Sequence, residues 1–134
     1  MKTKPVLTAE ELDPIVTACR AQAKAMGLTI TIALVDDGGY PLRLERMDGA
    51  GPTTADAAIE KARTAALIRA PTVALARRLP GEPELLRLTN LFPMQGGQPL
   101  MVDGVCVGGL GISGAKPAQD DEVAAAGCAV LAAA

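Results

Sequence analysis

Two glycine-rich segments, residues 35–50 and 96–114, constrain the fold of this chain more than any other feature. Each contains a tight-turn sequence, Asp37-Gly38-Gly39 or Asp103-Gly104, between runs of residues that favour β-strands. Glycine readily adopts the positive φ that short hairpin turns require, so each segment predicts a β-hairpin. Alanine-rich stretches with helical spacing surround both hairpins. We therefore expect an antiparallel sheet covered by helices.

Capping residues and hydrophobic spacing predict the order of the elements in a single domain, residues 1–134, of the α/β (α+β) class. Strand 28–36 has apolar residues on both faces, which is typical of a central strand. Alternation in strand 42–47 places Leu42, Leu44 and Arg46 on one face, which we expect to be buried. The full set comprises helix 8–26, strands 28–36 and 42–47, a helix from Thr53 or Thr54 to Pro71, helix 72–79, strands 99–102 and 105–113, and helix 117–134.

The composition excludes several classes of function. The chain has a net charge of −2 and only two aromatic residues, Tyr40 and Phe92, so it lacks the basic and stacking surfaces of nucleic-acid-binding proteins. It has no histidine, which excludes a Ser-His-Asp triad, histidine-bound zinc and histidine-ligated haem. Its three cysteines lie far apart, so we expect no metal site. With no secretory signal and no membrane-spanning run, a cytoplasmic location is expected.

Arg46 and Asp48 are the main candidates for a site. An arginine binds a carboxylate through two parallel hydrogen bonds, and a helix N-terminus nearby also favours anions. Arg46 is therefore expected to bind substrate, and Asp48 to act as a catalytic acid or base if the site buries it. In the alternative interpretation the two side chains pair with each other and only fix the turn. The sequence leaves both open.

Lys61 is the second catalytic candidate, provided that its neighbours desolvate it; otherwise it belongs to an ordinary solvated helix face. Four glycines are candidate substrate-binding positions because glycine lets a ligand approach the backbone closely. The alternative for these glycines is close packing, since the lysine and serine order of a phosphate-binding P-loop is missing. These four positions are Gly96, Gly97, Gly109 and Gly111.

Several short motifs, taken together and in this order, resemble the GlcG/HbpS family, which includes the C-terminal domain of PduO-type adenosyltransferases. The resemblance implies a profilin-like fold with a five-stranded antiparallel sheet between helical layers, a homo-oligomer, and small-molecule binding near the sheet. Some members associate with haem or corrinoids. The motifs are Val35-Asp-x-Gly-Gly, Arg46-Met-Asp-Gly-Ala50, Lys61-Ala-Arg-Thr-Ala65, Gly97-x-Pro-Leu100, Asp103-Gly104, Val107-Gly-Gly-x-Gly-Ile-Ser-Gly114 and Gln119-Asp120.

Residues and resemblance together predict a cofactor-free protein of catabolism whose partner is a small anionic metabolite. The expected chemistry is tautomerisation, hydration or deamination of an unsaturated carboxylate by acid-base catalysis. The alternative is a protein that binds haem or another tetrapyrrole without a histidine ligand, for storage, sensing or degradation. The missing histidine disfavours haem as a cofactor. A third interpretation is a purely structural oligomer.

Overall fold

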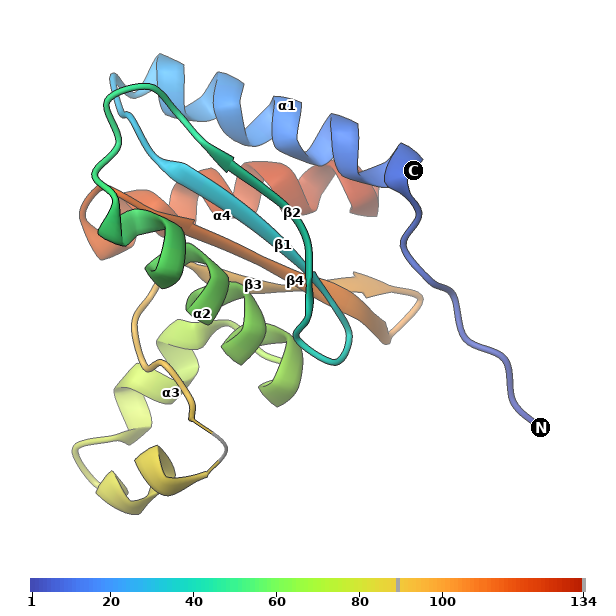
Figure 1. The fold of residues 1–134 in the computed structure, drawn as a ribbon. Helices are drawn as coiled ribbons and strands as arrows, with labels where there is room; N and C mark the ends of the chain where they lie inside the picture. The colour runs from blue at the N-terminus through green and yellow to red at the C-terminus, as the bar shows by residue number, and fades with distance from the viewer. Residues whose placement is uncertain (89, 134) are drawn as a thin grey trace.

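The computed structural model describes residues 1–88 and 90–133, in which helices cover both faces of one antiparallel sheet (Figure 1). The predicted helices and hairpins are present, with ends that differ by a few residues. No helix in the described part of the chain is long and apolar enough to cross a membrane. The elements are α1 (Ala9–Ala25), β1 (Thr31–Asp36), β2 (Pro41–Arg46), α2 (Thr53–Ile68), α3 (Thr72–Arg78), the 3₁₀ helix η1 (Pro83–Arg87), β3 (Gly97–Val102), β4 (Val105–Ser113) and α4 (Pro117–Ala132).

The sheet has four strands in the described residues, in the order β2-β1-β4-β3, with every neighbouring pair antiparallel. The expectation of a central first strand is confirmed, because β1 lies between β2 and β4. The expectation of five strands is wrong, since the described residues between α2 and β3 form α3, η1 and irregular chain. The profilin-like topology stays a prediction.

Both hairpin turns use the positive φ that the sequence predicts. Gly39 has φ +90° in the first turn, and Gly104 has φ +77° in the second. The carboxylate of Asp36 accepts hydrogen bonds from the backbone N–H groups of Gly38 (2.9 Å) and Tyr40 (3.0 Å). These bonds fix the first turn and thereby the register of β1 against β2.

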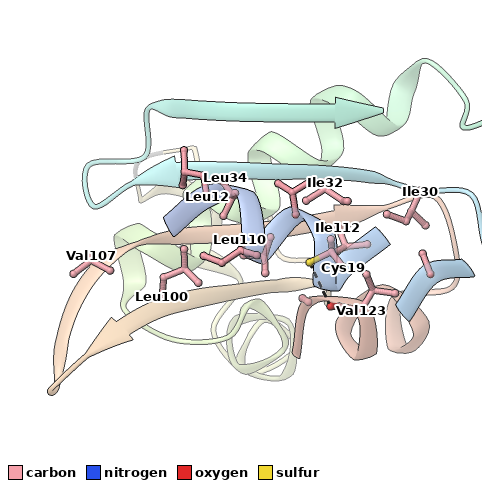
Figure 2. Packing of buried hydrophobic residues seen from close by; sticks show 14 residues of the cluster. Leu12, Cys19, Ile30, Ile32, Leu34, Leu100, Val107, Leu110, Ile112 and Val123 are labelled. Carbon is pink, nitrogen blue, oxygen red and sulfur yellow. Dashed lines mark hydrogen bonds between the residues drawn. The ribbon is translucent and has the colours of Figure 1, made fainter. Parts of the chain in front are cut away.

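One face of the sheet carries the larger part of the core, beneath α1 and α4 (Figures 1 and 2). Branched side chains of β1 and β4 interdigitate there with the apolar stripes of the two helices, which removes them from water. The cluster includes Ile30, Ile32, Leu34, Leu110 and Ile112 from the strands and their approaches, and Leu12, Ile15, Cys19 and Val123 from the helices.

The other face packs against α2 at unusually short range. A Cβ added to Gly109 would collide with the carbonyl oxygen of Ala62, and one added to Gly111 with that of Ala58. Glycine on β4 thus lets the helix backbone approach the strand backbone directly, with Ala33 on β1 completing the contact. This arrangement explains why α2 is rich in alanine.

The edge strand β2 is left largely uncovered on the α2 face. Leu42 and Leu44 expose 42% and 44% of their surface, and Arg46 on the same face is also exposed. The expectation that this face is buried is therefore wrong. Alternation in β2 is correct, but α2 lies over β4, β1 and β3, so β2 projects beyond the helix.

Candidate functional site

A surface cavity of about 390 Å³ lies where the last turn of α1 meets the end of β2. Arg20 and Lys24 are four residues apart and so share one face of α1. The end of β2 and the turn after it supply the opposite wall. Gly49, with φ +93°, redirects the chain immediately after this wall. The lining residues are Arg20, Lys24, Glu45, Arg46, Met47 and Asp48.

Arg20 and Glu45 form one wall of the cavity as a forked ion pair. Both the Nε and the Nη2 of Arg20 donate to the Glu45 carboxylate at 2.7 Å. Hydrogen bonding to Arg20 lowers the pKa of the Glu45 carboxyl, with smaller contributions from the charges of Arg43 and Lys24. Because this pair neutralises itself, the remaining charge of the cavity comes from Lys24, Arg46 and Asp48.

Arg46 and Asp48 are both exposed and line this cavity together. Within the described residues, neither side chain makes a hydrogen bond or an ion pair, with each other or with any other group. The alternative in which they form a pair that fixes the turn is therefore not observed. A guanidinium without a protein partner has all its donors available for an anion.

Arg46 and Asp48 do not lie beside the glycine-bearing strand β4. The strand β1 separates β2 from β4. The backbone of β4 therefore contributes nothing to this cavity, whose walls come from α1, β2 and the turn that follows.

Lys61 lies in a different part of the molecule and is almost wholly buried, at 2% exposure. Its Nζ donates to the backbone oxygen of Ile112 (2.9 Å) and to the Asp120 carboxylate (2.9 Å). Asp120 also accepts the backbone N–H of Ala115 at 3.0 Å. Burial raises the pKa of the Asp120 carboxyl, and the Lys61 ammonium opposes this effect. These neighbours thus remove Lys61 from water, as a catalytic lysine would require. They also bind its ammonium group by hydrogen bonds, which makes the group a structural contact.

The sequence explains Asp120 adequately as an acidic residue at a helix start, so its pairing with Lys61 was missed. One signal was available. Lys61 falls on the same stripe of α2 as Ala58, Ala62 and Ala65, which are all buried. A charged residue on such a stripe requires a buried partner of opposite charge.

The four candidate glycines do not join Arg46 and Asp48. Gly96 and Gly97 cover the Lys61 pair: a Cβ on Gly96 would lie 3.0 Å from the Lys61 Nζ, and one on Gly97 would collide with the Lys61 carbonyl. They precede or begin β3, at the sheet edge opposite β2. Gly109 and Gly111 face α2. The predicted site residues thus separate into three groups.

A second cavity, of about 250 Å³, lies between the N-terminal segment, the β3–β4 hairpin and the end of α4. Glu11 is its one charged lining residue. The Thr8 backbone N–H donates to that carboxylate at 2.6 Å, which forms the capping box at the start of α1. The cavity is otherwise apolar, lined by Pro5, Val6, Leu7, Val102, Val107 and Leu131. No group of three Cys, Asp or Glu residues in the described chain has the arrangement of a metal site.

Comparison with known proteins identifies the family. The family model described as "Haem degrading protein HbpS-like" matches residues 7–129. The chain belongs to the HbpS-like family. This HbpS-like chain is 40% identical to the protein GlcG of Escherichia coli K12 over 114 residues, which cover 84% of this chain and 85% of GlcG. The resemblance to the GlcG/HbpS family is thereby confirmed.

Solved structures of relatives extend the similarity to the fold. A double mutant of HbpS from Streptomyces reticuli superposes on this HbpS-like chain with a TM-score of 0.91 at 36% identity, covering 98% of this chain and 90% of that one. The crystal structure of a PduOC:haem complex superposes with a TM-score of 0.86 at 27% identity, covering 94% and 95%. The fold of this chain is thus that of known relatives.

Proposed function

We propose that this HbpS-like protein binds a small anionic metabolite, an unsaturated carboxylate, in the cavity between α1 and β2. The observation that carries this proposal is that Arg46 and Asp48 line a cavity of about 390 Å³ and that neither side chain has a partner among the described residues. Three cationic and two anionic side chains line it, although the whole chain has a net charge of −2. A locally positive hollow on a negative protein attracts anions selectively.

Arg46 leaves β2 on the α2 face and lines the cavity from the free edge of that strand, where it binds the carboxylate of the metabolite by two parallel hydrogen bonds. Lys24 adds a second positive charge from α1. Asp48 exchanges a proton with the bound molecule, which accounts for tautomerisation, hydration or deamination of an unsaturated oxo- or amino-acid. Asp48 is exposed in the unliganded chain. Its environment becomes less aqueous when the ligand covers it, and the reaction depends on that closure.

The experiment is a thermal-shift screen of unsaturated mono- and dicarboxylates, followed by calorimetric titration of each hit into wild type, Arg46→Ala and Arg77→Ala. Loss of a charged hydrogen bond predicts weaker binding by Arg46→Ala, by about 1.5–3 kcal/mol or roughly tenfold to a hundredfold in Kd. Arg77 is an exposed arginine of α3 and serves as the matched control. Equal affinity of the two variants would contradict the proposal.

Asp48→Asn separates binding from catalysis. The amide keeps the size of the side chain but cannot exchange the proton, so the affinity of a hit should persist while any turnover disappears. Turnover is followed by the loss of ultraviolet absorbance of the conjugated acid. Full turnover by Asp48→Asn would assign proton transfer to another group and leave Asp48 without a catalytic role.

Haem binding is the second candidate function, and it is favoured by the names of the relatives. The matching family model is described as haem-degrading, and one structural relative was crystallised as a haem complex. The residues of this chain fit a haem poorly. Neither cavity described above is lined by an aromatic side chain, and Met47 is the one soft donor on their walls. Tyr40 lies outside both cavities at 74% exposure.

Cys19 and Cys128 are poorly suited to replace histidine as an iron ligand. Burial raises the pKa of the Cys19 thiol to about 12 and that of Cys128 to about 11. Both are therefore protonated at neutral pH, and the thiolate is the form that ligates metals. For this reason we place the anionic metabolite first.

A further inference from the structure

We propose that the second cavity, of about 250 Å³, binds a short aliphatic ammonium compound, with its alkyl chain inside the cavity and its ammonium group on the Glu11 carboxylate. The ligand of this site is a cation, whereas the ligand proposed for the cavity between α1 and β2 is an anion. Three features support the assignment: the chemistry of the lining, the free oxygen of Glu11 and the attachment of the N-terminal wall.

The lining of the cavity restricts the ligand to an aliphatic compound with one polar end. Six of the seven described lining side chains are aliphatic and form no hydrogen bond, and none is aromatic. An alkyl chain placed among them leaves water and covers apolar surface of the protein. An apolar cavity of about 150 Å³ is large enough to bind benzene, so a cavity of about 250 Å³ accommodates a chain of about six carbons.

Glu11, in the first turn of α1, supplies the charge of the lining. The backbone N–H and the hydroxyl of Thr8 both donate to its Oε2. The other oxygen, Oε1, has no partner among the described residues and can accept a hydrogen bond from an ammonium group. The hydrogen bonds from Thr8 also lower the pKa of the Glu11 carboxyl, so this group is ionised at neutral pH.

The N-terminal wall of the cavity is attached to the rest of the domain at both ends and in its middle. Lys4 forms an ion pair with Asp37 of the first hairpin turn. Leu7 packs against the core, where a Cβ on Gly108 of β4 would lie 2.8 Å from its Cδ1. The capping box at the start of α1 holds the other end of the segment. The cavity is therefore formed before a ligand arrives, which lowers the entropic cost of binding.

The two cavities lie at opposite ends of α1 and select ligands of opposite charge. Glu11 is in the first turn of the helix, whereas Lys24, which lines the other cavity, is in the last. At about 1.5 Å per residue, the two positions are about 20 Å apart along the helix axis. The Glu11 carboxylate repels an anion, so the second cavity is not an extension of the first. Binding of the ammonium compound is thus independent of the function proposed above.

The first test titrates n-hexylammonium into isotope-labelled protein and follows the amide resonances, with n-hexanol and n-hexanoate as probes of the same chain length. We expect saturable shifts at Val102, Val107 and Leu131 with n-hexylammonium, and weaker binding of n-hexanol. The carboxylate n-hexanoate should bind least, because Glu11 repels it. No saturable shift with n-hexylammonium, shifts confined to other residues, or equal affinity of the three probes would overturn the proposal.

The second test removes the charge of Glu11 and keeps the helix cap. Glutamine can take the place of glutamate in a capping box, so Glu11→Gln retains the start of α1. This variant should bind n-hexylammonium more weakly, by roughly tenfold or more in Kd, and n-hexanol as the wild type does. Glu10→Gln, an exposed neighbour outside the cavity lining, is the matched control and should keep the wild-type affinity for both probes. Unchanged n-hexylammonium affinity in Glu11→Gln, or an equal loss in Glu10→Gln, contradicts the assignment of the ammonium group to Glu11.

Discussion

Lys61 of α2 and Asp120 of α4 form an ion pair inside the protein, with 2.9 Å between Nζ and Oδ2 and each side chain only 2% exposed. The same ammonium binds the Ile112 carbonyl of β4, so one side chain connects two helices and the sheet. Taking both charges out of water is costly, and their attraction mainly offsets that cost. The pair therefore specifies how α2, β4 and α4 meet more than it adds net stability.

Removing either partner of this pair should destabilise the fold strongly, because the other charge is left buried and alone. We expect Lys61→Met and Asp120→Asn each to lower the free energy of unfolding by about 3–5 kcal/mol. The double variant should lose much less than the sum of the two. Urea unfolding measures all three, and Glu122→Gln, an exposed change on α4, is the control. Strictly additive losses would show that the two charges do not interact.

Gly111→Ala should destabilise the protein by overpacking. The new methyl group would collide with the Ala58 carbonyl of α2, which is backbone and cannot move without shifting the helix. Such insertions typically cost about 1–3 kcal/mol and sometimes more. Gly51→Ala is the matched control, since no atom lies within 4 Å of the added Cβ. If Gly111→Ala keeps its melting temperature but loses ligand affinity, the substrate-binding role predicted from the sequence would be correct.

The sequence predicts most of the fold because its signals are local. The Thr8 capping box and the positive φ of Gly39 and Gly104 depend on neighbouring residues, and alternation correctly assigns the two faces of β1. The exposure of β2 was not predictable in this way. Whether Leu44 is buried depends on where α2 lies across the sheet, and that is a property of tertiary packing.

The candidate site was predictable only in part. Arg46 and Asp48 do line one cavity, because they are two residues apart at the end of one strand. Lys61 and the glycines do not join them, because strand order places β3 and β4 away from β2. Asp120 lies 59 positions after Lys61, and nothing in the local sequence indicates that they pair. Contacts between distant segments are what single-sequence patterns omit.

The Arg20–Glu45 pair should make a small, pH-dependent contribution to stability. Hydrogen bonding lowers the folded-state pKa of Glu45 below the ordinary value of 4.5, so the stabilisation is present above that pH and is lost as the pH falls through the lower folded value. Both side chains are about one-third exposed (35% and 34%), which limits the contribution to about 1 kcal/mol or less.

The measurement compares wild type with Glu45→Gln. The difference in the free energy of unfolding should be larger at pH 7 than at pH 3, and 0.5 M salt should reduce it at pH 7. Glu84→Gln, an exposed change in η1, controls for unspecific charge effects. A difference that grows as the pH falls would mean that Glu45 is not stabilised as a carboxylate by Arg20.

Hemin should bind this protein weakly and without a defined axial ligand. The chain has no histidine, and Cys19 and Cys128 are protonated at neutral pH because burial raises the pKa of each thiol. Titration followed by absorbance should give a broad Soret band and no stoichiometric end point. The titration is repeated on Met47→Leu, Tyr40→Phe and Cys19→Ala, which remove three candidate donors one at a time. We expect all three to match the wild type, because no aromatic side chain lines either cavity and, of these three residues, Met47 alone lines one.

The opposite result would reverse the order of the two candidate functions. A sharp Soret band with one hemin per chain, abolished by a single one of these substitutions, would identify that residue as the iron ligand.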